Sequence, residues 1–452
     1  MIGKITKKLL KNIPGGSHTY SRGFDQFSSN APEIFYKGKG AYLFDNKNNR
    51  FLDYGMALRA VSIGYSEDKI NKAAKRQIDL GNNFTRASIT ELEASELFLK
   101  TIKNANMVKF AKNGSSAVTA AVKLARAFTN KSIILRCSDH PFFSYDDWFI
   151  GSTEIKKGIP KEIYKLTVNF KYNNINDLKD KIKKFKNQIS CVVLEPSTIG
   201  CPNSNFYSGC CGNFECKRDF KKENYLMEVQ NLCNENKIVF ILDEMITGFR
   251  WRLGGAQEMY NVKPDISTFG KAMANGFSIA AVCGKREIME LGSIEKKGTE
   301  RVFLLSSTFG AEMSSLGAFI ETVKFIKKNN VINSNWLNGY NFIRTFNDVS
   351  ESEGLIKYLY ASGVPCSPYY VTLDKKGVPS LMLRTILMQE MIKEKIIFPN
   401  FISICFYHNK DAIKKTRNAL QKAFLIYKKA VFGKTSVYLK GNSIKPVFRK
   451  FN

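Results

Sequence analysis

The 452-residue sequence lacks several features that would assign it to simpler classes of protein. It has no run of eighteen or more apolar residues, which argues against a membrane-spanning helix. Its first residues, MIGKITKKLLKNIPGG, are basic, but their apolar stretch is too short and too interrupted for a signal peptide. It contains no repeat of fixed period. These absences lead us to expect a soluble, cytoplasmic protein.

Acidic residues are scarce relative to basic ones, with 40 Asp and Glu against 69 Lys and Arg and a net charge of +29. Such an excess can attract nucleic acid, an anionic membrane surface or phosphate-bearing ligands. The lysines are scattered, however, and the sequence has no arginine-rich arm, helix-turn-helix or zinc-finger spacing. We therefore expect a solvated lysine surface without a membrane or nucleic-acid partner. A non-catalytic basic nucleic-acid-binding protein on the same scaffold remains an outside alternative.

Ten cysteines do not make a disulfide scaffold in a chain of this length. Cys191 and Cys283 fall in apolar runs typical of core strands, where cysteine acts as a small buried hydrophobe. Four others lie close together in one segment: Cys201, Cys210, Cys211 and Cys216. No CxxC pair occurs among them, so their spacing is poor for a metal site. We expect a cysteine-bearing surface insertion and no metal, with a metal or redox site as the alternative.

Apolar runs of about five residues alternate with helical patterns through the middle of the chain, which indicates buried parallel strands with crossover helices. Near the C-terminus, FISICFY is typical of a strand and is followed by a long amphipathic helix. The expected divisions are 1–66, an N-terminal segment of the small domain; 67–328, one large α/β domain; 329–430, a C-terminal α+β domain; and 431–452, a basic tail.

Three segments carry residue types that a cofactor site needs. In the first, AKNGSSAVTAAVKLARA, a strand ends, Gly114, Ser115 and Ser116 form a turn, and a helix begins. The N–H groups at the start of that helix, its positive end and two hydroxyls suit a phosphate group. Glycine and serine are also good helix caps, so the segment alone does not establish a phosphate site.

The other two segments place an acid and an amine. In VFILDEMITGFR, apolar residues lead to Asp243 at the end of an expected central strand, where open α/β sheets bind ligands. A carboxylate buried there needs a cation or hydrogen-bond donors. In DISTFGKAMANGF, Lys271 follows a short apolar strand, and burial would free its amine for a Schiff base. Taken singly, Asp243 also fits a capping residue and Lys271 a surface lysine.

The order of these segments resembles the fold-type I enzymes that use pyridoxal phosphate. The stretches LDEMITGFR and TFGKAMANGF are similar to the class III aminotransferases, most closely to proteins of the glutamate-1-semialdehyde 2,1-aminomutase kind, from about Ile13 to Lys429. The resemblance implies an α/β fold with a large, mostly parallel seven-stranded sheet, helices on both faces and a smaller α+β domain. It also implies a homodimer with a shared active site.

Individual roles follow from the same resemblance. Lys271 would form the Schiff base and move a proton between the substrate carbon and the cofactor, while Asp243 would pair with the protonated pyridine nitrogen. Met245 would pack on one ring face, and Phe142 or Phe143 would supply the stacking aromatic. The other implied contacts are with the phosphate (Gly114, Ser115, Ser116, and Ser307 and Thr308 of the neighbouring subunit), the cofactor's hydroxyl side (Glu195) and a substrate carboxylate (Arg22).

Departures from the family pattern concern the substrate. In CSDHPFFSYDDWF, His140 precedes the aromatic residues, whereas the family has a histidine after its aromatic. The segment 151–174 is shorter than the aminomutase's gating loop, Leu58 stands where an aromatic is expected over the substrate, and LEPSTIG lacks the usual residues after Glu-Pro. A shortened loop favours transfer between two molecules over transfer within one.

We therefore expect an enzyme that uses pyridoxal phosphate to transfer an amino group between an amine or amino acid and a carbonyl compound. Its partners would be a small-molecule amino donor and a carbonyl acceptor. Intramolecular transfer of the glutamate-1-semialdehyde 2,1-aminomutase type is the alternative, because overall similarity favours it. A racemase or epimerase with the same cofactor is the third possibility.

Overall fold

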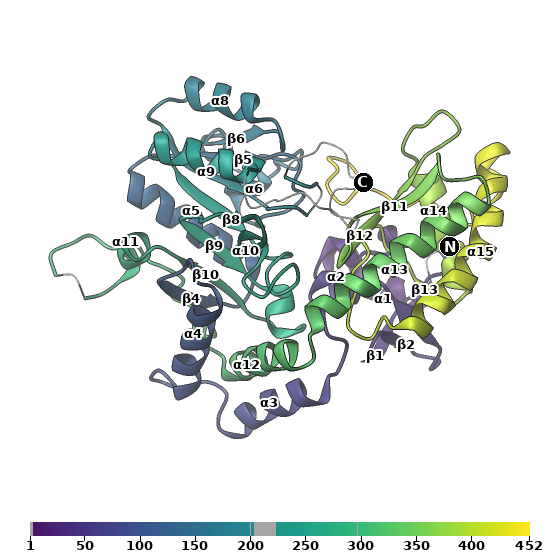
Figure 1. The fold of residues 1–452 in the computed structure, drawn as a ribbon, viewed down its shortest axis with the longest axis horizontal. Coiled ribbons are helices and arrows are strands. Elements are labelled where there is room, and N and C mark those ends of the chain that lie inside the picture. The colour runs from purple at the N-terminus through teal and green to yellow at the C-terminus, as the bar shows by residue number, and fades with distance from the viewer. Residues whose placement is uncertain (1–2, 199, 203–222, 296) are drawn as a thin grey trace. The chain divides into compact units, whose positions relative to one another are not determined.

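The computed structural model describes residues 3–198, 200–202, 223–295 and 297–452, which form two compact units (Figure 1). Within these ranges, unit 1 contains residues 3–67 and 333–449. Unit 2 contains residues 68–332 and 450–452. Unit 1 is therefore built from both ends of the chain and unit 2 from its middle.

A seven-stranded sheet forms the centre of unit 2, and its strands run parallel except for β10, which is antiparallel to both neighbours. The two central strands β7 and β8 have no exposed residue, as expected for apolar runs covered on both faces. The strand order is β4 (Met107–Ala111), β10 (Ala280–Gly284), β9 (Ile266–Phe269), β8 (Val239–Asp243), β7 (Ile189–Leu194), β5 (Ile133–Cys137) and β6 (Thr167–Phe170). The prediction of a mostly parallel α/β sheet is confirmed.

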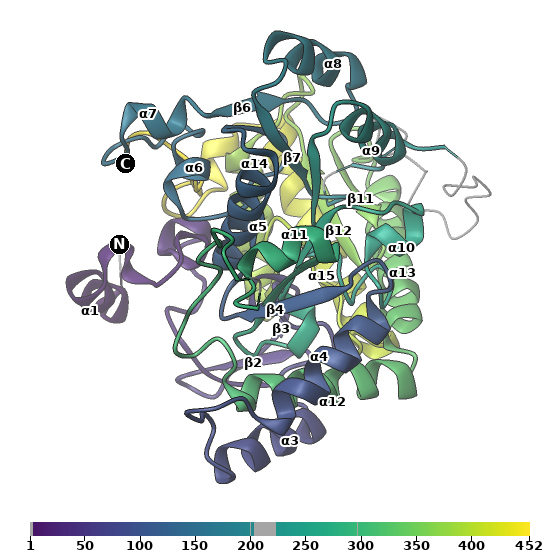
Figure 2. The same ribbon diagram turned by 90° about the vertical axis from the view of Figure 1, so that its left-hand side faces the viewer.

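Helices connect and cover these strands (Figure 2). The helix α5 (Gly114–Thr129) packs against β7, β8, β9 and β10. Because β4 leads directly into α5, this helix begins at the edge of the sheet where the parallel strands end. The other helices of unit 2 are α3 (Asp68–Asp79), α4 (Ile89–Thr101), α6 (Asp147–Ile150), α7 (Lys161–Tyr164), α8 (Ile175–Lys184), α9 (Tyr225–Glu235), α10 (Ala256–Tyr260), α11 (Arg286–Met289) and α12 (Met313–Lys328), with 3₁₀ turns η4 (Lys271–Ala274) and η5 (Glu290–Gly292).

Unit 1 combines a small sheet with helices around an aromatic core. Phe346 contacts Tyr370, Phe398 and Phe424 in this core. The sheet has the order β1 (Phe35–Lys39), β2 (Tyr42–Asp45), β3 (Arg50–Asp53) and β13 (Ile396–Ile397), and β11 (Leu359–Val364) pairs with β12 (Ser367–Thr372). The helical elements are α1 (Lys4–Asn12), α2 (Met56–Arg59), α13 (Val331–Ser352, in this unit from residue 333), α14 (Leu381–Lys393), α15 (Lys410–Phe432), η1 (Pro14–Gly16), η2 (Tyr20–Arg22), η3 (Phe24–Gln26) and η6 (Thr435–Val437).

The predicted strand over FISICFY is wrong, because the backbone of this segment bonds to several partners in turn. The N–H groups of Ile402, Ser403 and Phe406 donate to the carbonyls of Pro368, Tyr54 and Ser62. A strand needs one continuous neighbour, and this segment crosses between three. It is therefore an irregular connection that ends where α15 begins.

Hydrogen bonds attach the residues after α15 to unit 1. Lys440 N–H donates to Gln389 Oε1 at 2.7 Å, and Ile444 N–H donates to Thr385 Oγ1 at 3.0 Å. Further along, Arg449 pairs with the carboxylate of Asp25 at 2.7 Å. The basic tail thus joins the two ends of the chain within this unit.

A left-handed turn follows β3. The residues of α2, Met56 to Arg59, have φ values of 41°, 50°, 58° and 70°, although none of them is glycine. The buried carboxylate of Asp53 accepts from the N–H groups of Gly55 and Met56 and from the Tyr65 hydroxyl, and the Tyr65 hydroxyl accepts from Ala57 N–H. These bonds hold the turn in a conformation that costs about 1–2 kcal/mol per residue.

Candidate active site

The carboxyl ends of neighbouring parallel strands bring the predicted acid and amine to one edge of the unit 2 sheet. Asp243 is the last residue of β8, and Lys271 follows the adjacent strand β9 by two residues. On the other side of β8, Glu195 comes directly after β7. The strand order therefore places Asp243 between the segments that carry Lys271 and Glu195.

Asp243 is a buried carboxylate with one oxygen fully used. Its Oδ1 accepts from Met245 N–H at 2.9 Å and from the Thr268 hydroxyl at 3.0 Å. Its Oδ2 accepts no hydrogen bond from the residues that the structure describes. Burial raises the pKa of Asp243 to about 6, while the Met245 N–H, the charge of Lys271 and Thr268 act in the opposite direction. A cationic N–H at Oδ2 would keep this carboxylate ionised.

Lys271 begins η4 in a strained backbone conformation. Its φ is 47°, in the left-handed region that residues with side chains seldom occupy, and it follows Gly270. Strain of this kind is found where a side chain has to be aimed in a particular direction. The charge of Lys271 also acts on Asp243, which fits an amine placed close to the acid.

Met245 joins three motif segments at one place. A Cβ added to Gly114 would lie 2.9 Å from the Met245 sulfur, and one added to Gly270 would lie 2.6 Å from it. Both glycines thus make room for the thioether, which lies between the start of α5 and the turn before Lys271. Residues far apart in the sequence are brought together here.

The start of α5 is only partly open to a ligand. Asn113 caps the helix, and its Oδ1 accepts from Ser116 N–H at 2.9 Å and lies 3.1 Å from the Ser116 hydroxyl. The Ser115 hydroxyl oxygen accepts from Tyr145 N–H at 3.2 Å. The N–H groups of Gly114 and Ser115 remain at the open end of the helix. They are the donors that this turn offers most directly to an anion.

Tyr145 is a site residue that sequence reasoning missed. Its hydroxyl lies 3.4 Å from the Ser116 hydroxyl, and the side chain is 58% exposed. The phenol therefore stands beside the start of α5, where it can reach a bound phosphate. The sequence signal, a tyrosine shortly after the aromatic pair, has no meaning until the fold brings it to α5.

Of the two aromatic candidates for stacking, only Phe142 has an accessible ring. Phe142 is 45% exposed, whereas Phe143 is 2% exposed and packs against Phe149 and His140. Phe143 is thus part of the core of unit 2. His140 is also fully buried, and its Nδ1 accepts the Glu195 N–H at 3.0 Å.

The remaining predicted residues, Arg22, Ser307 and Thr308, are exposed. Ser307 and Thr308 are exposed in a segment of unit 2 without regular structure, and the Thr308 carbonyl accepts from the Asn83 side chain at 3.0 Å. Arg22 is an exposed residue at the end of η2 in unit 1. The contacts within unit 2 therefore assemble the acid, the amine, the methionine and the helix start, and they do not include these three residues.

The described residues fit pyridoxal phosphate. A buried carboxylate with an open oxygen suits a protonated ring nitrogen, an adjacent lysine suits the aldehyde, and the start of α5 suits the phosphate. Gly114 and Gly270 keep the Met245 side chain in place between these groups. The chemistry of this donor set matches the three functional ends of the cofactor.

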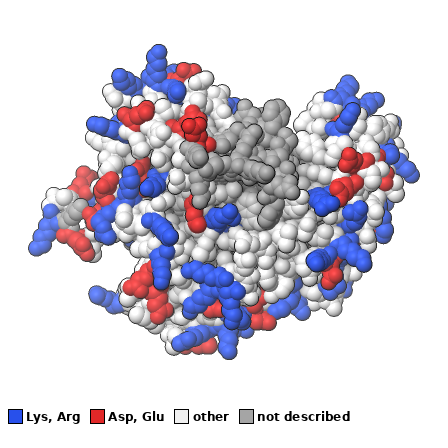
Figure 3. All heavy atoms as spheres, in the orientation of Figure 1, with Lys and Arg blue, Asp and Glu red and all other residues white. Residues whose placement is uncertain are grey.

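Two other features that the sequence singled out, the cysteines and the basic surface, can be compared with the described residues. Cys201 is buried, and Cys210, Cys211 and Cys216 lie outside the described residues. No cluster of His, Cys, Asp and Glu able to hold a metal ion is found in the part of the chain that the structure describes. In the same part, no helix is both long and apolar enough to cross a bilayer. On the face shown in Figure 3, basic side chains are spread out and interspersed with acidic ones.

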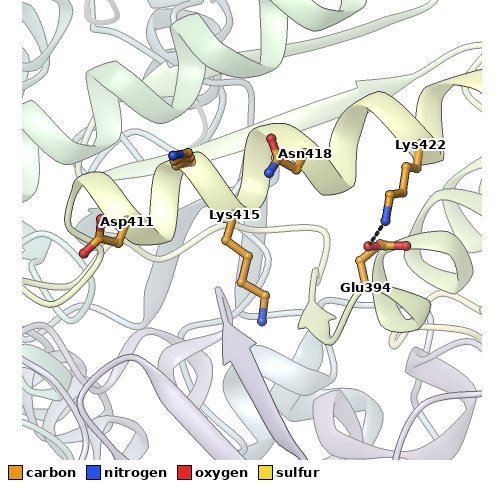
Figure 4. Close-up of a pocket in the computed structure, with 6 residues that line it drawn as sticks. Glu394, Asp411, Lys415, Asn418 and Lys422 are labelled. Atoms are coloured by element: carbon orange, nitrogen blue, oxygen red, sulfur yellow. Dashed lines mark hydrogen bonds and ion pairs between the residues drawn. The ribbon is translucent and has the colours of Figure 1, made fainter.

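A hollow of about 390 Å³ lies along α15 in unit 1 (Figure 4). Lys422 pairs there with Glu394 at 2.8 Å, and burial together with the charge of Arg50 lowers the pKa of Lys415. The lining residues are Glu394, Asp411, Lys414, Lys415, Asn418 and Lys422. This set contains no aromatic side chain, and its one acid–base pair is the ion pair between Lys422 and Glu394, so we assign no chemistry to it.

Comparison with known proteins agrees with this geometry. Residues 25–368 match the model of the family "Aminotransferase class-III". The chain is 30% identical over 423 residues to 3-aminobutyryl-CoA aminotransferase of Cloacimonas acidaminovorans, covering 92% of this chain and 95% of that protein. It is 33% identical over 320 residues to glutamate-1-semialdehyde 2,1-aminomutase of Methanocaldococcus jannaschii, covering 68% of this chain and 70% of that protein.

Solved structures show the same fold. The pyridoxal-phosphate form of the FumI protein of Sphingopyxis sp. MTA144 superposes with a TM-score of 0.81 at 22% identity, covering 94% of this chain and 96% of that one. An omega-transaminase from Sphaerobacter thermophilus superposes with a TM-score of 0.79 at 18% identity, covering 94% and 97%. Together with the strand-end acid and lysine, these matches show that the chain belongs to the class III aminotransferase family, whose cofactor is pyridoxal phosphate.

Proposed function

We propose that this class III aminotransferase moves an amino group between two molecules, an amine or amino acid and a carbonyl compound. The observation that carries the proposal is the buried Asp243, with one open oxygen, beside the segment of Lys271. The similarity to an aminotransferase along 92% of this chain supports the intermolecular reaction. The short 151–174 segment points the same way.

Each residue at the strand ends has a defined task. The Lys271 Nζ would hold the cofactor through its aldehyde, and the free amine would carry a proton from the substrate carbon to the cofactor carbon. Asp243 accepts a hydrogen bond from the ring nitrogen and keeps it protonated. When bound, pyridoxal phosphate supplies the aldehyde that takes up the amino group and the ring that accepts electrons from the substrate carbon.

Further residues position the ligand. The N–H groups of Gly114 and Ser115 bind the phosphate, with the Ser116 and Tyr145 hydroxyls beside them. Met245 packs against one face of the ring, and the accessible ring of Phe142 covers the other. Glu195 lies toward the cofactor's hydroxyl side.

The proposal includes a homodimer in which Ser307 and Thr308 of the neighbouring subunit complete the phosphate site. Their segment exposes Phe303 and Phe309, at 64% and 59%, two apolar side chains that a neighbouring subunit would cover. Arg22 would bind a substrate carboxylate through its guanidinium fork. The seven cysteines that the structure describes are free thiols, as expected in the cytoplasm, where we place the enzyme.

Intramolecular transfer is the second candidate, and the similarity to glutamate-1-semialdehyde 2,1-aminomutase favours it. The two reactions differ in the second carbonyl compound, which only intermolecular transfer requires. Amines would be added to the enzyme loaded with pyridoxal phosphate, and the absorption spectrum would be followed without any acceptor. Accumulation of pyridoxamine phosphate with release of a carbonyl product supports intermolecular transfer, whereas formation of an isomeric amine without an acceptor supports the mutase.

Lys271→Ala tests the central assignment. The wild-type protein should be yellow, and borohydride should fix the cofactor to it covalently. The variant should lose this reducible linkage, which is read by mass spectrometry of the reduced chain, and Lys285→Ala provides a control at an exposed lysine of the same unit. Retention of the linkage in Lys271→Ala would refute the proposal. Salt-sensitive nucleic-acid binding without any cofactor spectrum would support the non-catalytic alternative.

A further inference from the structure

Three buried polar groups near the end of β7 have no partner among the described residues. They are the His140 Nε2, the Ser197 hydroxyl and the Thr198 hydroxyl, in side chains that are 0%, 1% and 6% exposed. Ser197 and Thr198 follow Glu195 and Pro196, and His140 is attached to Glu195 through its backbone. All three groups therefore belong to one small region at the carboxyl ends of β5 and β7.

The hydrogen bond from Glu195 fixes the tautomer of His140. A backbone N–H can only donate, so the Nδ1 that accepts it at 3.0 Å carries no proton. Burial, together with the charge of Arg136, lowers the pKa of His140 to about 3, so the ring is neutral near pH 7. The proton of the neutral ring is consequently on Nε2, which makes this unpartnered atom a donor.

Packing holds the ring in this orientation. Its edge lies against Tyr172, with 5.0 Å between ring centroids, and against Phe143, at 6.1 Å. The Tyr172 hydroxyl in turn donates to the Pro196 carbonyl, which anchors the segment that carries Ser197 and Thr198. The ring that carries the N–H and the backbone that carries the two hydroxyls are thus both held in place.

A buried donor without an acceptor costs about 1–3 kcal/mol, so a folded chain rarely leaves several of them together. The position of these three groups in the sheet indicates which ligand can accept their hydrogen bonds. The sheet order β8, β7, β5 places them one and two strands from Asp243, and neighbouring strands are about 4.8 Å apart. The region is therefore close enough to share a ligand with Asp243.

We infer that His140, Ser197 and Thr198 form a donor pocket for the ring hydroxyl oxygen of pyridoxal phosphate, an inference that rests on the proposed function. Three neutral donors suit a single polar oxygen that also carries a partial negative charge. The buried carboxyl group of Glu195, 3% exposed, makes the same region unfavourable for a fully anionic group such as the phosphate. His140 acts as a positioning residue here, because it also fixes the backbone of Glu195.

The test is a binding cycle with the full chain and two cofactors, pyridoxal phosphate and its 3-deoxy analogue, which lacks the ring hydroxyl. Ser197→Ala and Thr198→Val each remove one hydroxyl with little change of shape. His140→Asn keeps an acceptor for the Glu195 N–H but removes the donor at the Nε2 position. His140→Gln keeps a donor near the Nε2 position. Dissociation constants are measured by absorbance and fluorescence on cofactor-free protein.

Each donor removal should weaken pyridoxal phosphate binding by about threefold to tenfold, as expected for one neutral hydrogen bond, and leave binding of the 3-deoxy analogue unchanged. His140→Gln should bind pyridoxal phosphate more tightly than His140→Asn. In the cofactor-free chain, Thr198→Val should raise the unfolding temperature by about 1–3 °C, because an unmet buried hydroxyl is removed.

Thr322→Val is the matched control. Thr322 in α12 has a buried hydroxyl that also lacks a partner in the described structure, and it lies on a helix outside the strand ends. This variant should gain stability without any change in cofactor affinity. The inference is overturned if the pocket variants bind pyridoxal phosphate as the wild type does, or if they weaken both cofactors equally. Failure of the wild type to bind pyridoxal phosphate through Lys271 would refute the proposed function instead.

Discussion

Replacing Asp243 by Asn should affect the cofactor-free and cofactor-loaded enzyme in opposite directions. Asn preserves the shape, and its Oδ1 can still accept from Met245 N–H and from Thr268. It removes a charge that burial makes unfavourable, which is why the pKa of Asp243 is raised from 3.8 to about 6. At about 1.36 kcal/mol per pKa unit, ionisation of this one group costs the folded, cofactor-free chain about 3 kcal/mol.

The pH dependence gives the sign of the effect. Because the pKa is higher in the folded than in the unfolded chain, the contribution of Asp243 to stability is fully present below about pH 4. It is lost as the pH rises through about 6. Asp243→Asn should therefore match the wild type near pH 4 and be more stable by up to about 3 kcal/mol near pH 8. With pyridoxal phosphate bound, the order reverses, since Asn cannot keep the ring nitrogen protonated.

Urea unfolding of both cofactor-free proteins between pH 4 and 8 measures the first effect, and turnover of the loaded enzymes measures the second. Asp180→Asn, an exposed change in α8, serves as the control and should show no such pH-dependent difference. Equal stability of Asp243→Asn and wild type at pH 8 would refute the electrostatic reasoning. Near-normal turnover of the variant would mean that another group holds the ring nitrogen.

Three other changes follow from the structure. Arg22→Ala should raise the apparent KM for a substrate with a carboxylate by about tenfold in steady-state kinetics, and no effect would indicate a substrate without one. Tyr65→Phe should destabilise the chain to urea by about 2–4 kcal/mol, because the Asp53 carboxylate and the Ala57 N–H lose a shared partner. Gly270→Ala should weaken cofactor binding by displacing Met245, and the added change Met245→Ala should restore part of it; an unaffected single variant would contradict this packing.

Local patterns predicted the apolar strands of unit 2, but not β6, in which Thr167 and Phe170 are buried and the residues between them are not. Five-residue apolar runs have few alternatives when they recur between helices, and Asp243 and Lys271 lie where such runs stop. The segment FISICFY has the same pattern and is irregular, because its bonding depends on which segments the rest of unit 1 places beside it. Burial alone therefore did not distinguish a strand from a buried connection.

Contacts between segments that are far apart in the sequence could not be predicted from local sequence patterns. Tyr145 meets Ser116 only when the fold brings the segment after β5 to the start of α5, and nothing near Tyr145 in the sequence signals this. The tautomer of His140 depends likewise on an N–H from another strand. The attachment of Arg449 to Asp25 joins residues from opposite ends of the chain, which no periodicity can indicate.

In the left-handed turn after β3, some positions tolerate substitution and others do not. Its unfavourable torsions are sustained by hydrogen bonds from its backbone to the Asp53 carboxylate and the Tyr65 hydroxyl. Leu58, which is 37% exposed, can therefore be exchanged for other residues that are not β-branched without disturbing the backbone. A change at Asp53 would instead release four residues at once to the right-handed form. A library of variants of this enzyme should therefore vary Leu58 and retain Asp53 and Tyr65.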